Sequence, residues 1–281
     1  MNRILLHKLI TDALAEDLGM GDLTTNSIFT DNDKGNGLFT AKADGVVAGL
    51  DCISLVYESL GSSVDVELLK QDGNSISKGD IIAKVNGPVK VLLSGERVIL
   101  NLVQHLSGIA TSTQNVVTLL DDDSIVITDT RKTLPGLRAI QKYAVTCGGG
   151  KNHRFRLDDG VMIKDNHIKA AGSITKAVEM VRSNIGHMVK IEVETETKDQ
   201  VLEAVNAGAD IIMLDNRTPN EVKDFVQMIP EGIIVEVSGG ITPDTIADYK
   251  GCGADVISLG WLTHSVKALD ISFNLSAERQ L

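Results

Sequence analysis

Cationic side chains gather in one stretch of a chain that is acidic as a whole. Between Arg131 and Ile168 the sequence has eight arginines and lysines against three aspartates, a local charge of +5, whereas the whole chain carries −11. A guanidinium binds a carboxylate or phosphate through two parallel hydrogen bonds, and an ammonium acts as a point charge. The cations that we single out are Arg131, Lys132, Arg154 and Lys164, with His153 beside them. We predict that this stretch binds a small polyanion; charge alone leaves a solvated basic loop as the alternative.

Two carboxylates follow at the ends of consecutive predicted strands, Glu194 and Asp215. In parallel α/β folds the active site forms at the carboxyl ends of the strands, so these side chains are expected at one rim. Together they could share a Mg²⁺ ion that is held partly by substrate oxygens. Hydrogen bonds to a ribose, or a salt bridge to a neighbouring lysine, are the open alternatives.

Small residues end the last two predicted strands, Ser238-Gly239-Gly240 and Gly260, and His264 follows shortly after. Glycines let backbone N–H groups approach a phosphate, and loops after the last strands of α/β barrels often bind one. Each glycine loop alone is equally typical of a plain tight turn. Together they predict a site for a phosphate monoester, with His264 as a further donor or only a structural partner.

The chain from Ser124 onward alternates apolar strands with amphipathic helices. Strands are predicted at 124–130, 160–166, 187–194, 209–216, 232–239 and 254–260, and helices at 174–183, 197–208, 218–229 and 242–253. Continuous apolar strands indicate burial on both faces and hence a parallel sheet. A closed eight-stranded barrel needs about 250 residues. Since fewer remain here, we predict an incomplete (β/α) barrel whose strand ends also carry Asp129 and Glu192.

The first ~120 residues follow a different pattern, judged from apolar periodicity. We predict a helix at 1–17, a turn at 16–25, and a long amphipathic helix at 94–120. Short strands separated by turn residues are expected at 37–43, 45–50, 64–70, 80–85 and 88–93, mostly antiparallel. The predicted domains are therefore 1–110 and 111–281, and the C-terminal tail can return to the first.

Composition excludes several classes of protein. The net charge argues against nucleic acid or an anionic membrane as a partner. No apolar run reaches the roughly 18 residues of a membrane span, and no signal-peptide pattern is present. Cys52, Cys147 and Cys252 are odd in number and far apart, which predicts reduced thiols, a cytoplasmic location and no zinc site.

Taken together, several segments closely resemble the quinolinate phosphoribosyltransferase family. They are EDLGMGDLTT, SGERVILNLVQHLSGIAT, DTRKTLPGLRAIQKYAVTCGGGKNHR, MIKDNHI, AGADIIMLDN, SGGIT and the GWLTHS segment with the KALDIS that follows. The resemblance covers nearly the whole chain in family order. It implies an α/β fold with an N-terminal α/β sandwich (1–110) and an incomplete TIM-like barrel (111–281).

The resemblance also implies an activity. Family members convert quinolinate and phosphoribosyl pyrophosphate to nicotinate mononucleotide, pyrophosphate and CO₂ in de novo NAD biosynthesis, with Mg²⁺. They are homodimers, sometimes higher assemblies, whose active sites are shared between subunits, and Arg97 would reach the partner's site. The residues that would surround the quinolinate carboxylates are Arg131, His153, Arg154 and Lys164. Lys132 and Lys164 would lie near pyrophosphate, and Glu194 and Asp215 would hold the ribose and Mg²⁺. The 5′-phosphate would be bound by Ser238, Gly239, Gly260 and His264.

Two positions depart from the family pattern, and two other functions stay open. Arg156 stands where the family commonly has glycine, and Asp158 replaces a frequent aromatic residue. The paralogue associated with molybdenum transport shares the DTRKT-type block, although KDNH at 164–167 favours the quinolinate enzyme. A non-catalytic sensor of a phosphate ligand would not need both Glu194 and Asp215 beside carboxylate-binding cations.

Overall fold

The computed structural model describes residues 1–61 and 63–278, which divide into two compact units. Unit 1 contains Met1–Gln114, Leu134–Gly149 and the segment from Thr263 onward, and unit 2 contains Asn115–Thr133 and Gly150–Leu262. Each unit has its own cluster of buried apolar side chains. Since the chain passes between the units several times, neither unit is a continuous segment.

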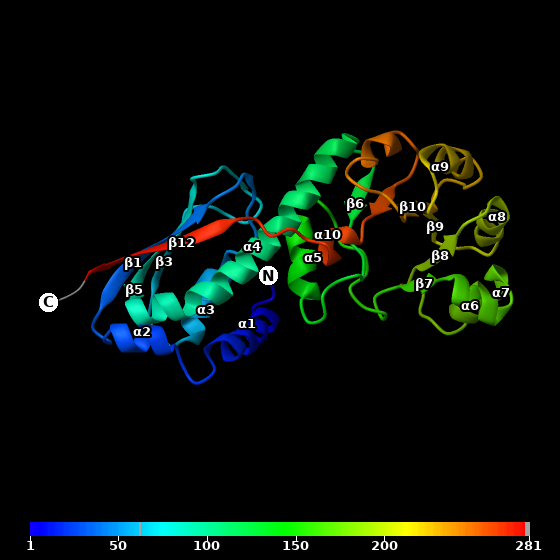
Figure 1. Cartoon of the computed structure of the whole chain (residues 1–281). Helices are drawn as coiled ribbons and strands as arrows, with labels where there is room; N and C mark the ends of the chain where they lie inside the picture. The colour runs from blue at the N-terminus through cyan, green and yellow to red at the C-terminus, as the bar shows by residue number, and fades with distance from the viewer. Residues whose placement is uncertain (62, 279–281) are drawn as a thin grey trace. The chain divides into compact units, whose positions relative to one another are not determined.

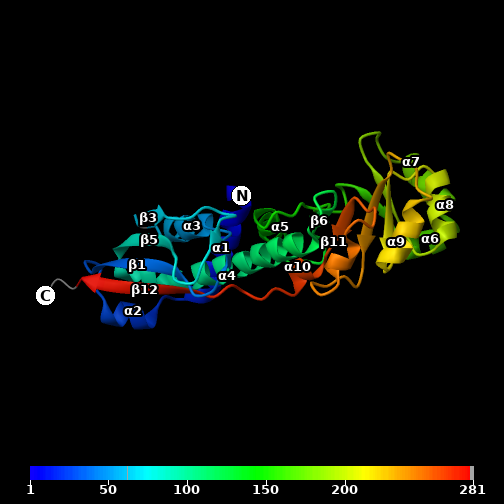
Figure 2. The ribbon, with the colours of Figure 1, turned by 90° about the horizontal axis from the view of Figure 1, so that it is seen from above.

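Unit 1 is built around a four-stranded antiparallel sheet in the order β12-β1-β5-β3. Figure 2 shows the C-terminal strand β12 alongside β1, where Phe273 is the register partner of Phe39 and their ring centroids are 4.8 Å apart. The strands of this unit are β1 Lys34–Ala41, β2 Gly45–Val46, β3 Asp65–Leu68, β4 Ser75–Ile76, β5 Ile81–Pro88 and β12 Ile271–Glu278. Its helices are α1 Arg3–Leu18, α2 Leu23–Ile28, α3 Asp51–Ser59 and α5 Arg138–Cys147, together with most of α4 Val89–Leu120.

Unit 2 contains six parallel strands in the order β6-β11-β10-β9-β8-β7. They are β6 Val126–Thr128, β7 Val161–Ile163, β8 Ile191–Thr195, β9 Ile211–Asp215, β10 Ile234–Ser238 and β11 Val256–Ser258. Within the described residues β6 and β7 do not pair with each other, so the barrel is open between them. The predicted fold class, an α/β chain with an incomplete parallel barrel, is confirmed.

Helices follow the strands of unit 2 and flank them in Figure 1. They are α6 Asp165–Ala171, α7 Ile174–Arg182, α8 Lys198–Asn206 and α9 Pro219–Val226; a short 3₁₀ helix, η1 Ile246–Tyr249, follows β10, and α10 Trp261–His264 follows β11. Ser173, Thr197 and Thr218 cap three of them through side-chain hydrogen bonds to backbone N–H groups of the first turn. Each such cap contributes about 1 kcal/mol and fixes where its helix begins.

Three predicted elements differ from the structure. Residues 88–93 were expected as a strand, but α4 begins at Val89. Val89 and Leu92 are fully buried and three positions apart, so they lie on one face of the helix, and glycines further along the helix pack closely. A Cβ at Gly95 would lie 2.9 Å from the Tyr57 ring, and one at Gly108 would lie 2.3 Å from the Lys267 carbonyl. Tertiary contacts therefore override the strand-like pattern of the first turn.

The other two differences are shorter elements. In residues 45–50 only the two-residue strand β2 forms. The helix α3, which follows them, was not predicted from the sequence. The helix expected at 242–253 is limited to η1, since Gly251 and Gly253 both adopt positive φ, which a helix does not allow. None of the helices in the described part of the chain is long and apolar enough to span a membrane.

Candidate active site

Four predicted residues form the rim of a pocket at the carboxyl ends of adjacent strands in unit 2. Lys164 follows β7, Glu194 lies in β8, Asp215 ends β9 and Ser238 ends β10. Asp215 and Ser238 are register partners, so their side chains face the same side of the sheet. The pocket has a volume of about 320 Å³. The predicted residues that line it are Arg131, Lys132, His153, Arg154, Lys164, Glu194, Asp215 and Ser238.

An acidic pair and a lysine occupy one side of the pocket. Lys164 Nζ forms an ion pair with Glu194 Oε2, with the Glu194 side chain 15% exposed. Burial raises the pKa of Asp215, and the nearby Glu194 raises it further, while Lys164 acts in the opposite direction. A carboxylate whose charge is disfavoured by burial and by a second carboxylate gives, together with that neighbour, a suitable place for a cation. Glu194 thus forms the salt bridge to a neighbouring lysine that the sequence left open as an alternative. The carboxylates of Glu194 and Asp215 would also be suitable ligands for a divalent ion.

Two arginines, Arg131 and Arg154, contribute positive charge to the lining of the pocket. Arg154 Nη1 donates to the Gly160 carbonyl at 2.7 Å, which fixes its guanidinium. Burial lowers the pKa of Arg154, and the like charge of Arg131 lowers it further. Guanidinium groups held near each other in this way are stabilised by an anion between them. This part of the pocket is therefore suited to a substrate with carboxylate groups.

The departure at Arg156 does not strain the backbone. The N–H groups of Phe155 and Arg156 both donate to Asp159 Oδ2, at 2.7 and 3.0 Å. Among the described residues only Asp121 and Asn216 are non-glycine residues with positive φ, so Arg156 has an ordinary conformation. Its side chain is exposed and adds a positive charge to the loop.

The glycine loops have a structural reason for glycine. Gly239 has a φ of +90°, and a Cβ there would lie 2.2 Å from Asn216 Oδ1. Trp261 Nε1, next to Gly260, donates to the Ile241 carbonyl at 3.0 Å and so joins the loops after β10 and β11. The packing explains Gly239 without a ligand, and phosphate binding at Gly239 and Gly260 stays a prediction.

Arg97 and His264 belong to unit 1. Arg97 is exposed on α4, and His264 is exposed in α10 with Nδ1 2.7 Å from Ser265 Oγ. Their predicted roles at the partner's site and at the phosphate stay predictions.

Below the rim lies a second set of residues, which we call the floor. It consists of the residues two positions before each rim residue on the same strands: Met162, Glu192, Met213 and Glu236. Strand residues two positions apart face the same side, which is why rim and floor share one interior. Sequence analysis assigned no role to this layer and missed Glu236 altogether. The signal was its position two residues before Ser238 in an otherwise apolar strand.

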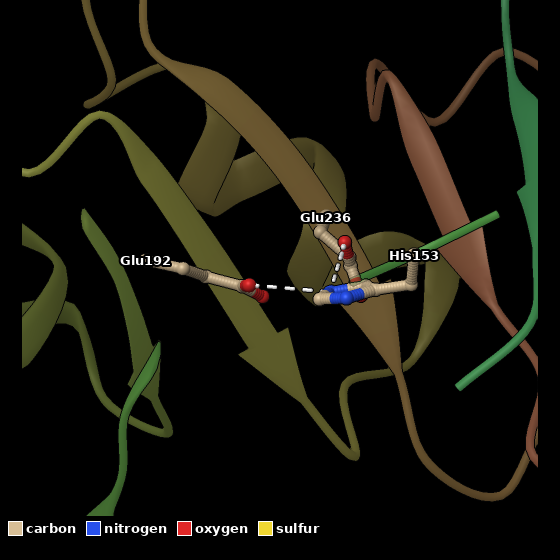
Figure 3. A group of neighbouring side chains, drawn as sticks. All are labelled: His153, Glu192 and Glu236. Atoms are coloured by element: carbon tan, nitrogen blue, oxygen red, sulfur yellow. Dashed lines mark ion pairs between the residues drawn. The ribbon is translucent and has the colours of Figure 1, made fainter. Parts of the chain in front are cut away.

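The floor holds a cluster of His153, Glu192 and Glu236. Figure 3 shows the two carboxylates approaching the imidazole from different strands, with Nε2 3.2 Å from Glu192 Oε2 and 3.5 Å from Glu236 Oε2. Glu192 and Glu236 are only 3% and 4% exposed. Their ligand atoms and that of His153 lie within 4.8 Å of one another, close enough to hold a metal ion or to share protons.

Opposing effects act on the charge of His153. Burial lowers its pKa, but hydrogen bonds to Glu192 and Glu236 raise it more, to about 9. The Arg154 N–H donates to Nδ1 at 2.7 Å. Because that bond needs a lone pair on Nδ1, it opposes the second proton that the glutamates favour. Nε2 carries a proton in the imidazolium and also in the neutral tautomer that makes these contacts. The ring therefore points Nε2 at the two glutamates in both forms.

An open parallel barrel whose rim joins cations to paired carboxylates defines an enzyme-like site for a small polyanionic substrate. The model of the quinolinate phosphoribosyl transferase C-terminal domain matches residues 109–274, and that of its N-terminal domain matches residues 22–107. The chain is 51% identical over 280 residues to a probable nicotinate-nucleotide pyrophosphorylase [carboxylating] of Bacillus subtilis, covering 100% of this chain and 96% of that protein. A protein of the same name from Methanocaldococcus jannaschii is 42% identical, covering 95% and 96% of the two chains.

Solved structures agree. NadC from Streptococcus pyogenes superposes with a TM-score of 0.96 at 40% identity, covering 99% of each chain. The nicotinate-nucleotide pyrophosphorylase from Francisella tularensis has a TM-score of 0.94 at 35% identity, covering 98% of each. This chain belongs to the quinolinate phosphoribosyl transferase family.

Proposed function

We propose that this chain is a carboxylating phosphoribosyltransferase, which converts quinolinate and phosphoribosyl pyrophosphate into nicotinate mononucleotide, pyrophosphate and CO₂. The observation that supports it most directly is the pocket of unit 2, where Arg131, Arg154 and Lys164 share one cavity with Glu194 and Asp215. A dicarboxylate needs the cations, and a ribose with a metal-bound leaving group needs the carboxylates. The reaction belongs to de novo NAD biosynthesis.

Quinolinate binds through its two carboxylates. Arg131 and Arg154 provide bidentate donors, and each charge-assisted hydrogen bond contributes about 1.5–3 kcal/mol. The Gly160 carbonyl holds Arg154 in place before the substrate arrives. This preorganisation points the ring nitrogen of quinolinate at the anomeric carbon of the ribose, a proximity effect of several kcal/mol.

Pyrophosphate leaves on the side of the lysines. Lys132 and Lys164 stabilise the charge that develops on the leaving group, while Glu194 and Asp215 hold the ribose hydroxyls. Glu194 and Asp215 are also the residues that would hold Mg²⁺, since the charge of Glu194 raises the pKa of Asp215 and both side chains line the cavity. When bound, Mg²⁺ supplies charge neutralisation for pyrophosphate. Ser238, Gly239, Gly260 and His264 bind the 5′-phosphate in this proposal.

Decarboxylation follows from the charge of the product of the first step. Once the ring nitrogen carries the ribose it is quaternary, and it stabilises the carbanion left when the adjacent carboxylate departs as CO₂. A proton from solvent then adds to that carbon and gives nicotinate mononucleotide. No side-chain nucleophile is needed. The contribution of the protein is electrostatic preorganisation around the dicarboxylate and the pyrophosphate.

The test is an assay with Mg²⁺, phosphoribosyl pyrophosphate and either quinolinate or nicotinate. We expect nicotinate mononucleotide and CO₂ in equal amounts with quinolinate, and no turnover with nicotinate. A folded protein that is inactive with quinolinate would contradict the proposal and favour an acceptor of the paralogue type.

A shared site in a cytoplasmic homodimer is the second part of the proposal. Its support is the exposure of Arg97 on α4, the family resemblance, and three free cysteines. The test is to unfold the Arg97→Ala and Asp215→Ala variants, mix them in equal amounts and refold them together. Random pairing gives each mixed dimer one intact site, so about a quarter of wild-type activity should return. No recovery in mixed dimers would place Arg97 in its own subunit's site.

A further inference from the structure

Two glutamates are buried below a pocket that we expect to bind anions, and the free-energy cost of burying them needs an explanation. Removing a carboxylate from water costs several kcal/mol unless partners compensate, and here the charge also opposes an anionic substrate. We propose that Glu192 and Glu236 are positioning residues: they orient the His153 ring and, through it, the Arg154 that binds the substrate. This inference rests on the function proposed above, in which Arg154 binds a carboxylate of quinolinate.

Three strands of the barrel hold the segment that contains His153 and Arg154. Directly after β6, the fully buried Asp129 accepts the His153 backbone N–H at 3.0 Å and the Asn152 amide at 2.6 Å. From β8 and β10, Glu192 and Glu236 accept from the ring (Figure 3). The segment itself has no regular secondary structure, so these contacts set its position.

The ring is held by one nitrogen shared between two acceptors. Nε2 lies within hydrogen-bonding distance of both carboxylates, at 3.2 and 3.5 Å, and the His153 side chain is only 13% exposed. Rotating the ring away from either glutamate would leave a buried carboxylate without this donor. The pair therefore confines the ring more strictly than one glutamate could.

From the ring, the constraint passes to Arg154. Its backbone N–H donates to His153 Nδ1 at 2.7 Å, and its Nη1 donates to the Gly160 carbonyl at 2.7 Å. The arginine is thus fixed at its backbone by His153 and at its guanidinium by the loop. Because both ring nitrogens of His153 contact protein atoms, the ring acts on the substrate through Arg154.

A divalent ion is the other occupant that one imidazole and two carboxylates could hold. Substituting Glu236 by glutamine separates the two possibilities. Glu236 Oε1 has no hydrogen-bond partner among the described residues, so a glutamine can place its NH₂ there and keep its oxygen on Nε2. Orientation survives this change, whereas a metal ion or a required charge does not.

The experiment compares Glu236→Gln, Glu236→Leu and Glu192→Leu with Glu203→Gln as the matched control. Glu203 is a half-buried glutamate of unit 2 that accepts from Thr175 N and Oγ1 at 2.9 and 3.0 Å, outside the pocket. In the leucine variants we expect the KM for quinolinate to rise about tenfold, the loss of one charge-assisted hydrogen bond, with the KM for phosphoribosyl pyrophosphate changed less than about twofold. Glu236→Gln should stay within about threefold of wild type, and Glu203→Gln should be unchanged.

The second readout does not depend on turnover. The backbone amide resonance of Arg154 in substrate-free protein should move in the leucine variants and stay near its wild-type position in Glu236→Gln. A Glu236→Gln variant as impaired as Glu236→Leu, or an Arg154 resonance that no variant moves, would overturn the positioning role. If the wild-type protein turned over no quinolinate, the proposed function would fail while the amide signal still decided this inference.

Discussion

Rim and floor of the same pocket differ in burial, charge and purpose. The rim residues Lys164, Glu194, Asp215 and Ser238 are partly exposed and face the substrate, whereas Glu192 and Glu236 below them are almost fully buried. At the rim, opposite charges meet near solvent and can exchange partners when a substrate binds. At the floor, the two buried glutamates are paired with the imidazole of His153. In the proposed reaction the rim residues interact with the substrates, whereas the floor residues hold the binding residues in position.

The largest expected effect is at the rim. Lys164→Ala removes the cation that pairs with Glu194 and stabilises the leaving pyrophosphate, so kcat/KM should fall about 10³-fold. The measurement is CO₂ release at varied phosphoribosyl pyrophosphate. Lys169→Ala is the control, since it removes an exposed lysine that pairs with Asp165 on α6. Equal losses in both variants would contradict the assignment of Lys164 to the reaction.

An intermediate effect is expected at the floor. Glu236 is one of the two carboxylates that raise the pKa of His153 from 6.5 to about 9, so Glu236→Gln should lower it. A raised pKa stabilises the fold fully below pH 6.5, and this contribution is lost as pH rises toward 9. In the variant the contribution should be smaller and should be lost completely at a lower pH. NMR titration of the ring proton of His153, and unfolding in urea from pH 6 to 9, measure both; an unchanged pKa would mean that Glu236 does not act on the ring.

The smallest effect is expected at a buried hydroxyl at the end of β6, where an unpaired polar group lowers the free energy of unfolding. Thr128 Oγ1 is buried and has no hydrogen-bond partner among the described residues, so Thr128→Val should raise the free energy of unfolding by about 1 kcal/mol. Activity should change by less than about twofold, because no role in binding is assigned to this hydroxyl. Thr195→Val is the matched control, since Thr195 Oγ1 donates to the Met213 carbonyl at 3.0 Å and should lose about 1 kcal/mol. A destabilised Thr128→Val would indicate a partner for that hydroxyl.

The rim could be predicted from the sequence because a strand end is marked by a change of residue type. Apolar runs end at Lys164, Glu194, Asp215 and Ser238, and a parallel sheet brings such ends to one edge. The floor could not be predicted in the same way. Glu236 sits between Val235 and Val237, so the pattern indicates only a strand interior. Its partner His153 comes from a segment without regular structure, and no periodicity places that segment below the rim.

The N-terminal half shows a different limit. The antiparallel strands of unit 1 were predicted where alternation is clear, but Val89–Leu93 were assigned to a strand although they begin α4. Their β-branched and leucine residues suit either state, and the burial of Val89 and Leu92 on one face of the helix depends on packing that the local sequence does not show. Local pattern identifies an element when its neighbours agree, and tertiary packing decides when they do not.

The most direct test of the central claim uses quinolinate with ¹³C in the carboxylate next to the ring nitrogen. We expect this label to leave as CO₂ only when phosphoribosyl pyrophosphate and Mg²⁺ are present, in amounts equal to the nicotinate mononucleotide formed. Label retained in the nucleotide, or CO₂ released without phosphoribosyl pyrophosphate, would contradict it.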